Sequence, residues 1–168
     1  MRPERFLILF AIYFLAFFGL LLAPFAMPSV LVFSRALVNT AAYLIHLCGG
    51  HVLVQGTVLR ASPSGFAVEM KDGCNGANVL ILLWSAVIAF PATVAYKAKG
   101  VFWGALTIQS VNLVRFISLF YLGQYSLSLF EFAHEYLWES LIMLDGLLFF
   151  GWWVHLVSRA VPKPHANR

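Results

Sequence analysis

Three polar residues stand in apolar surroundings and carry the side chains that nucleophilic catalysis needs: Cys74, Arg115 and His134. Cys74 lies in the stretch MKDGCNGANVLILLW, about one turn ahead of a helix that the apolar run from Ala77 predicts. A helix amino terminus favours negative charge, and therefore the thiolate, which is the nucleophilic form of cysteine. Asn75 is available to cap that helix. The alternatives for Cys74 are a packing role or a disulfide with Cys48.

Arg115 lies well inside the apolar run 101–121. Inserting an arginine there costs about 2.5 kcal/mol or more, so it marks a functional site or a paired charge. Asn112, one turn earlier, faces nearly the same way and is placed to hold the guanidinium. A structural interpretation instead pairs Arg115 with Asp145. Asp145 falls eleven residues after His134, almost the same face of a continuous helix, so we expect it to point into the bundle and support the site.

The composition places these residues in a membrane protein. Of the 168 residues, 61% are hydrophobic and only 11% are charged, which is typical of a polytopic membrane protein. We expect one all-α integral membrane domain over 1–168, with about four or five transmembrane or interfacial helices. Uncharged runs of roughly 20 residues suffice to span the ~30 Å hydrocarbon layer, and they predict spans at 6–26, 77–96, 101–121 and 136–158.

Two further segments have different patterns. Residues 29–47 are apolar but carry Arg35, Asn39 and His46 near one helical face, which predicts a helix lying in the interface or tilted against the bundle. A full crossing is the alternative. Residues 51–70 alternate on both sides of Ser-Pro-Ser-Gly, which predicts a small extracytoplasmic β-hairpin. Its second strand leads the chain to Cys74.

The basic residues set the predicted orientation. They are scattered at the ends of apolar runs, so the net charge of +4 indicates topology and not a nucleic-acid partner. One arrangement places most of them in the cytoplasm: Arg2, Arg5, Lys97, Lys99, Arg159, Lys163 and Arg168. At about 1.5 Å per residue from Val101, Arg115 then lies about 21 Å across the membrane. Cys74 and His134 fall on the same outer side, so the three candidates converge on one membrane face.

Other site chemistry is weakly supported. The two cysteines and five histidines show neither CxxC nor HxxxH spacing, which argues against a metal centre. The sequence also has no glycine-rich phosphate loop and no GxSxG motif. We therefore expect neither a metal nor a cofactor.

Three motifs carry a resemblance to a known family. The stretches GCNGANVLILLW, NLVRFISLF and FEFAHEYLW resemble, in this order, the cysteine, arginine and histidine motifs of the exosortase/archaeosortase membrane transpeptidases. The resemblance covers about 66–158. The short chain is similar to the compact bacterial exosortases paired with IPTL-type or PEP-type carboxy-terminal tags. It departs from the family at Trp138, where the histidine motif has a glycine.

The resemblance implies a cysteine peptidase or transpeptidase in the bacterial cytoplasmic membrane, with its active site facing the periplasm. Its partners would be membrane lipid and secreted proteins that end in a short motif, a hydrophobic helix and a basic segment. Cys74 would form a thioacyl enzyme, His134 would move protons, and Arg115 would hold the oxyanion or the thiolate. Asn112, Asn75 and Asp145 would support these three.

Two other functions remain open from the residues alone. One is a non-enzymatic membrane subunit, held by a Cys48–Cys74 disulfide and a structural pair of Arg115 with Asp145. The other is a channel or carrier that uses Arg115 as an anion site.

Overall fold

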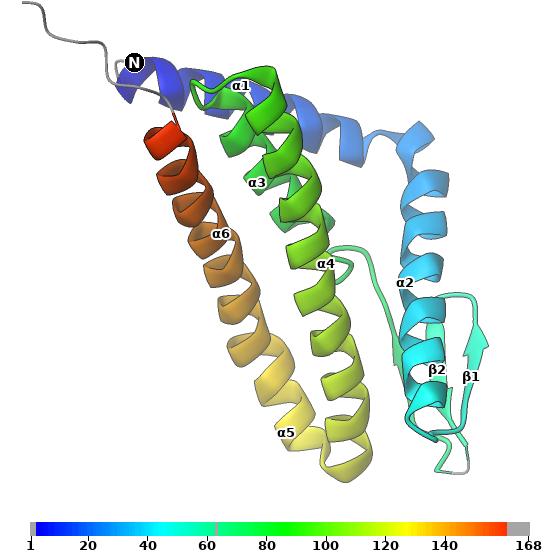
Figure 1. Cartoon of the computed structure of the whole chain (residues 1–168). Helices are drawn as coiled ribbons and strands as arrows, with labels where there is room; N and C mark the ends of the chain where they lie inside the picture. The colour runs from blue at the N-terminus through cyan, green and yellow to red at the C-terminus, as the bar shows by residue number, and fades with distance from the viewer. Residues whose placement is uncertain (1–2, 63, 161–168) are drawn as a thin grey trace, which may run out of the picture.

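The computed structural model describes residues 3–62 and 64–160 and shows a helical bundle with one small sheet (Figure 1). Within the described residues, four helical segments are long and apolar enough to cross a membrane. This confirms the predicted all-α polytopic membrane fold. The helices are α1 (Pro3–Leu22), α2 (Met27–Leu47), α3 (Ala77–Ala89), α4 (Val94–Tyr125), α5 (Leu127–Phe132) and α6 (Trp138–Ala160). A short 3-10 turn, Pro24–Ala26, joins α1 to α2, and a π-helical turn, Ala133–Leu137, joins α5 to α6.

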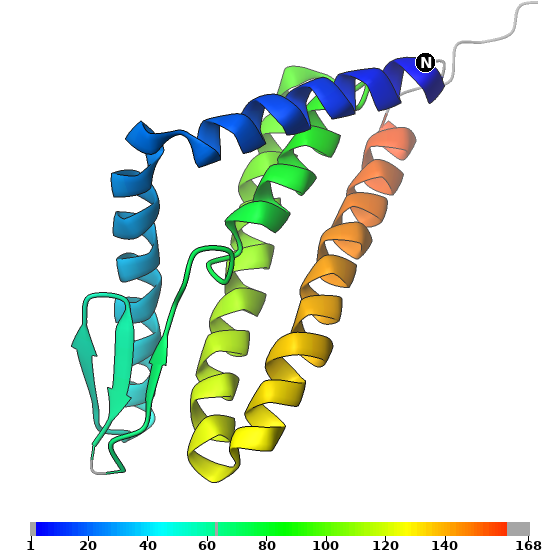
Figure 2. The same ribbon diagram turned by 180° about the vertical axis from the view of Figure 1, so that it is seen from behind.

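The long helices are arranged around α4. Helices α4 and α6 run side by side in opposite directions, and α2 lies along the far part of α4 beside the sheet (Figures 1 and 2). Helix α1 crosses the bundle at a steep angle and packs on α3. The start of α1, the start of α4 and the end of α6 lie together, which we call the basic end because Arg5, Lys97, Lys99 and Arg159 are found there.

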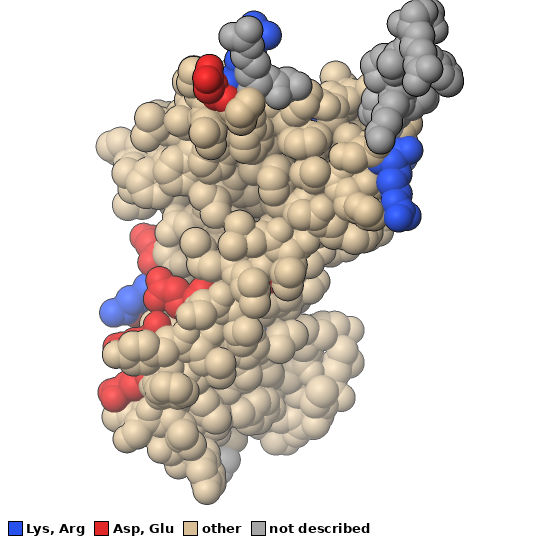
Figure 3. Space-filling model, turned by 90° about the vertical axis from the view of Figure 1, so that its left-hand side faces the viewer, with Lys and Arg blue, Asp and Glu red and all other residues tan. Residues whose placement is uncertain are grey.

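The charged residues are separated along the molecule. Figure 3 shows that, apart from one acidic side chain beside basic ones at the top, the acidic side chains gather over the middle and far part of one face. The exposed acids of that part of the chain are Glu69, Asp72, Glu131, Glu135 and Glu139. Most of the remaining surface in this view is uncharged, as a membrane-embedded protein requires.

Helix α3 is shorter than the sequence predicts. The predicted span 77–96 assumes that Pro91 is tolerated within one helix, but α3 ends at Ala89 and α4 begins at Val94. Phe90 has the extended conformation (φ −69°, ψ 140°) that a following proline favours. With 13 residues, α3 is about 20 Å long and cannot cross a ~30 Å hydrocarbon layer. Its amino terminus therefore begins inside the molecule, beside the middle of α4.

The sheet has three strands and not the two of the predicted hairpin. Strands β1 (Val52–Gln55), β2 (Val58–Ala61) and β3 (Ala67–Glu69) form an antiparallel sheet in the order β1-β2-β3. The register pairs Leu53 with Arg60 and Leu59 with Val68. Gly56 has φ +67° and makes the extra turn that divides the first predicted strand. As predicted, the last strand leads the chain to Cys74.

Two apolar cores meet along α4. One core joins α2, the sheet and the far part of α4, where Phe116 and Phe120 are buried. The other joins α3, α4 and α6 around Ile108 and Trp153. The buried polar residues Asn112 and Arg115 lie on α4, the helix that the two cores share, and the buried Ser34 and Asn75 lie on α2 and in the loop before α3. Along α4, Asn112 and Arg115 lie between Ile108 of one core and Phe116 and Phe120 of the other. These buried polar residues therefore lie where the two cores meet.

Candidate active site

The backbone around Cys74 is a tight loop between β3 and α3. Gly73 and Gly76 on either side have φ values of +89° and +77°, which other residues rarely adopt. The Cys74 N–H donates to the carbonyl of Lys71 at 3.0 Å. Gly76 also lies against α4, because a Cβ there would be 3.0 Å from Nε2 of Gln109. The two glycines therefore let the loop turn and approach α4 closely.

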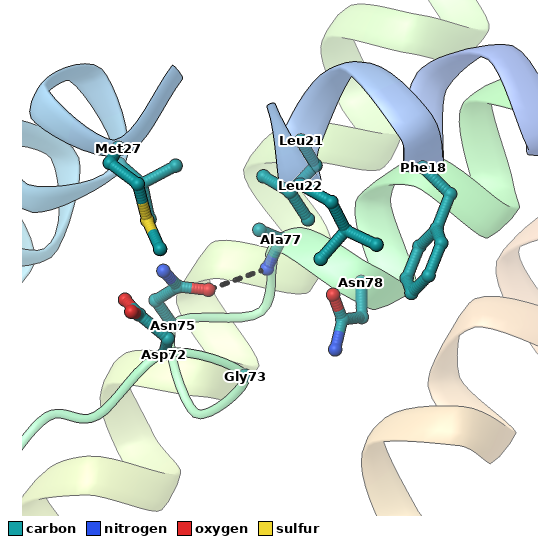
Figure 4. A pocket seen from close by; sticks show the side chains of 10 residues that line it. Phe18, Leu21, Leu22, Met27, Asp72, Gly73, Asn75, Ala77 and Asn78 are labelled. Carbon is teal, nitrogen blue, oxygen red and sulfur yellow. Dashed lines mark hydrogen bonds between the residues drawn. The ribbon is translucent and has the colours of Figure 1, made fainter. Parts of the chain in front are cut away.

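Asn75 fixes this loop from three directions. Its Oδ1 accepts a hydrogen bond from the N–H of Ala77, the first residue of α3, at 3.0 Å (Figure 4). Its Nδ2 donates to Oγ of Ser34 on α2 at 3.1 Å. Its carbonyl accepts from Nε2 of Gln109 on α4 at 3.2 Å. Asn75 is 1% exposed, and it satisfies a free N–H at the start of α3 as predicted, although Gly76 occupies the capping position itself.

Cys74 and His134 are in contact. The Sγ of Cys74 lies 3.6 Å from Nε2 of His134, which is within hydrogen-bond distance for sulfur. The imidazole stacks on the ring of Phe130, with centroids 5.7 Å apart and planes 12° apart. His134 sits in the π-helical turn between α5 and α6. Such turns insert an extra residue and often occur at functional sites.

Arg115 lies in the same place and is not paired with Asp145. It is 8% exposed and lines two cavities together with Cys74 and His134. No ion pair joins Arg115 to Asp145 among the described residues, and the buried Oδ2 of Asp145 has no hydrogen-bond partner there. The structural interpretation of Arg115 is therefore wrong. The structure brings the cysteine, arginine and histidine together, as predicted from three separate segments.

Asn112 lies in the site but does not hold the guanidinium. It is 1% exposed, and its Nδ2 donates to Oε1 of Gln109 at 3.4 Å. The described residues show no hydrogen bond between Asn112 and Arg115. Its Oδ1 is buried without a partner among them.

Asp145 is not part of the site. It is absent from the residues that line the cavities at Cys74. The prediction assumed a continuous α-helix from His134, whereas the π-helical turn contains that histidine and shifts every later residue to a different face.

The two cavities differ in size. The smaller has about 40 Å³ and lies between Cys74, Asn112, Arg115 and His134. The larger has about 440 Å³ and opens between the Cys74 loop and α6. Asp72 and Glu139 also line this larger cavity. Phe130 was not predicted, although its spacing of four residues from His134 on a helix would have indicated the contact.

The two cysteines are both free. Cys48 is exposed at the end of α2, and Cys74 is partly buried in its loop. The predicted alternative of a Cys48–Cys74 disulfide is therefore wrong. Among the described residues, no group of three His, Cys, Asp or Glu side chains is arranged to hold a metal ion.

The fold and the site together define a multi-pass membrane protein in which a cysteine, a histidine and an arginine line the same two cavities. The comparison with protein families agrees that the chain is a transmembrane protein. The family model Transmembrane exosortase (Exosortase_EpsH) matches residues 3–157, nearly the whole chain, and the protein belongs to this family. No curated protein and no solved structure matches the chain.

Proposed function

We propose that the protein is a cysteine transpeptidase that cleaves carboxy-terminal sorting signals of secreted proteins at the outer face of the bacterial cytoplasmic membrane. The observation that carries the proposal is the 3.6 Å contact between Cys74 Sγ and His134 Nε2 beside the buried Arg115. A thiol next to an imidazole is the arrangement that nucleophilic catalysis by cysteine needs. Membership of the exosortase family supports the same chemistry.

The first half of the reaction forms an acyl enzyme. The thiol proton of Cys74 passes to Nε2 of His134, and the thiolate attacks the carbonyl carbon of the scissile peptide bond. A C–S bond forms, the carbonyl oxygen becomes an oxyanion, and the C–N bond then breaks. His134 gives its proton to the departing nitrogen, so the amine leaves neutral and the substrate remains as a thioester on Cys74.

The second half releases the acyl group. An acceptor with an N–H or O–H group, or water, attacks the thioester carbonyl while His134 takes its proton. The C–S bond breaks, and the thiolate of Cys74 recovers the proton from His134. Whether the acyl group is transferred or hydrolysed depends on which acceptor enters the larger cavity. Asp72 and Glu139 line that cavity, and their carboxylates favour an acceptor with hydrogen-bond donors or positive charge.

Arg115 stabilises the oxyanion in both halves. Its guanidinium lies in the cavity with Cys74 and is largely removed from solvent. Charge stabilisation is much stronger in such surroundings than in water, because little solvent screens it. The positive end of α3, which begins three residues after Cys74, favours negative charge at the sulfur.

The cavities favour a substrate that is itself anchored in the membrane. Val79 lines both the larger cavity at Cys74 and an apolar groove of about 260 Å³ between α1, α3 and α6. The groove extends toward the basic end, where Phe6 and Phe150 line it. A peptide with a polar motif followed by an apolar helix would place its motif at Cys74 and its helix along the groove.

The test is co-expression with a secreted protein from the same genome that ends in a short motif, an apolar helix and arginines. Wild type is expected to shorten this substrate on a gel, and Cys74→Ala is expected to leave it full length. Cys48→Ala is the matched control, because Cys48 is the other free cysteine and lies outside the site. Membrane abundance of each variant is measured in parallel.

Three results would decide between the functions. Cleavage by wild type and Cys48→Ala but not by Cys74→Ala supports the peptidase. Equal substrate size with all three proteins, in the presence of a substrate that is cleaved in its native host, refutes it. A channel or carrier would keep its anion transport in Cys74→Ala and lose this transport in Arg115→Ala.

A further inference from the structure

Asn112 presents a hydrogen-bond acceptor whose orientation is fixed by its neighbours. The carbonyl of Asn75 can only accept, so Gln109 must donate to it through Nε2. The Oε1 of Gln109 is then left to accept, and Nδ2 of Asn112 donates to it. This relay leaves Oδ1 of Asn112 as the free end, buried and without a hydrogen-bond partner among the described residues.

The side chain that carries this acceptor lines the cavity of the reacting groups. Asn112 is 1% exposed and lines the small cavity of about 40 Å³ with Cys74, Arg115 and His134. A buried acceptor without a donor is unfavourable, and native proteins rarely keep one unless something binds to it. Arg115 lies one turn further along α4 on nearly the same face, and it offers donors where Asn112 offers an acceptor.

We propose that Oδ1 of Asn112 accepts a hydrogen bond from the backbone N–H of the substrate residue whose carbonyl Cys74 attacks. This inference rests on the proposed peptidase function and adds a recognition element to it. The N–H and C=O of one residue in an extended peptide point to the same side. Asn112 and Arg115 are separated by about 4.5 Å along α4, so one residue can reach both, its N–H at Asn112 and its carbonyl oxygen at Arg115.

The assignment makes Asn112 a substrate-binding residue that orients the scissile carbonyl. It also explains the relay, because Gln109 prevents the Asn112 amide from turning and presenting its NH₂ group to the peptide. A donor at that position would oppose the substrate N–H. Asn112→Leu removes the acceptor with little change in size, and Gln109→Met removes only the group that holds its orientation.

The experiment uses the full-length protein in detergent and a synthetic peptide that spans the cleavage site, located first by mass spectrometry of the cleaved product. A second peptide replaces the residue before the scissile bond by its α-hydroxy acid, so that the N–H becomes an ester oxygen and the scissile amide is unchanged. The kcat/KM of wild type is expected to fall about tenfold on this swap, as loss of one buried hydrogen bond implies. The kcat/KM of Asn112→Leu on the normal peptide is expected to be about tenfold below that of wild type. Its kcat/KM is expected to fall by less than about a further twofold on the peptide with the ester oxygen.

The kcat/KM of Gln109→Met on the normal peptide is expected to fall less than that of Asn112→Leu, because the amide of Asn112 can still take the productive orientation part of the time. Asn39→Leu, an exposed asparagine on α2, is the control and is expected to match wild type.

The outcomes separate this inference from the proposed function. If the swap leaves wild-type kcat/KM unchanged, the inference is refuted, and this holds even where Asn112→Leu fails to fold. If the effects of the swap and of Asn112→Leu multiply, Asn112 acts without touching that N–H, and the inference is refuted as well. If Cys74→Ala cleaves the normal peptide, it is the proposed function that fails.

Discussion

Gly76→Ala tests whether the Cys74 loop depends on its close approach to α4. Gly76 has φ +77°, and a Cβ built there would lie 3.0 Å from Nε2 of Gln109 and 3.4 Å from Nδ2 of Asn112. The substitution therefore strains the backbone and pushes on the relay that connects Asn75 to Asn112. Gly56→Ala is the matched control, because Gly56 has φ +67° and no atom within 4 Å of its Cβ position.

The two variants share one cost and differ in another. A left-handed conformation costs a residue other than glycine roughly 1–2 kcal/mol, and both variants carry this cost. Only Gly76→Ala adds overpacking, which costs roughly 1–3 kcal/mol. The gain from a less flexible unfolded chain, about 0.4–1 kcal/mol, applies to both and cancels in the comparison. Gly76→Ala is therefore expected to be the less stable by roughly 1–3 kcal/mol.

The assay is thermal unfolding of the purified proteins in detergent, followed by tryptophan fluorescence. For a chain of this size about 1 kcal/mol shifts the melting temperature by roughly 2–4 °C, so the gap between the variants is expected to exceed about 2 °C. Substrate cleavage is expected to fall with Gly76→Ala and to persist with Gly56→Ala. Equal melting temperatures and equal cleavage by the two variants would show that the contact with Gln109 does not position the loop.

Two further predictions concern the neighbours of the site. Phe130→Leu removes the ring stacked on His134 and is expected to lower the rate of substrate cleavage severalfold. It also removes an edge contact with Phe66, so some loss of stability is expected and rates are compared per amount of folded protein. Phe132→Leu, at an exposed position, is expected to change neither rate nor stability, and equal rates for the two variants would refute an orienting role for the stack. Both cysteines of unreduced, denatured protein are expected to react with a maleimide that adds visible mass, giving two additions per chain without reductant and one in Cys48→Ala. A single oxidised pair would give none before reduction.

The sequence predicted the fold class and the convergence of Cys74, Arg115 and His134 because these depend on coarse properties. Hydrophobic run length determines which segments enter a membrane, and the basic residues at their ends order them. A lone arginine in such a run is anomalous enough to indicate a functional site or a paired charge. These signals survive errors of several residues in the element boundaries.

The errors arise where a single residue decides between two backbone conformations. Pro91 is compatible with a kinked helix or with a helix end. The structure has the helix end, and in this conformation Phe90 packs against the rings of Phe150 and Trp153. Gly56 is likewise compatible with a strand or a turn. The π-helical turn at His134 has no sequence signature that was recognised, so the face of Asp145 was assigned incorrectly.

The short length of α3 explains why the site contains buried polar groups. Because α3 begins inside the molecule, the chain from β3 to α3 is not helical, and its backbone groups need partners other than those of a helix. Such backbone is tolerated only where protein groups or a water-filled cavity satisfy it. Here Gln109 donates to the carbonyl of Asn75, and the side chain of Asn75 accepts from the N–H of Ala77. The cavity that the short helix leaves is also the one that Arg115 lines. A version of α3 extended to the membrane surface would remove the cavity, and with it the reason for a buried Asn75, Asn112 and Arg115.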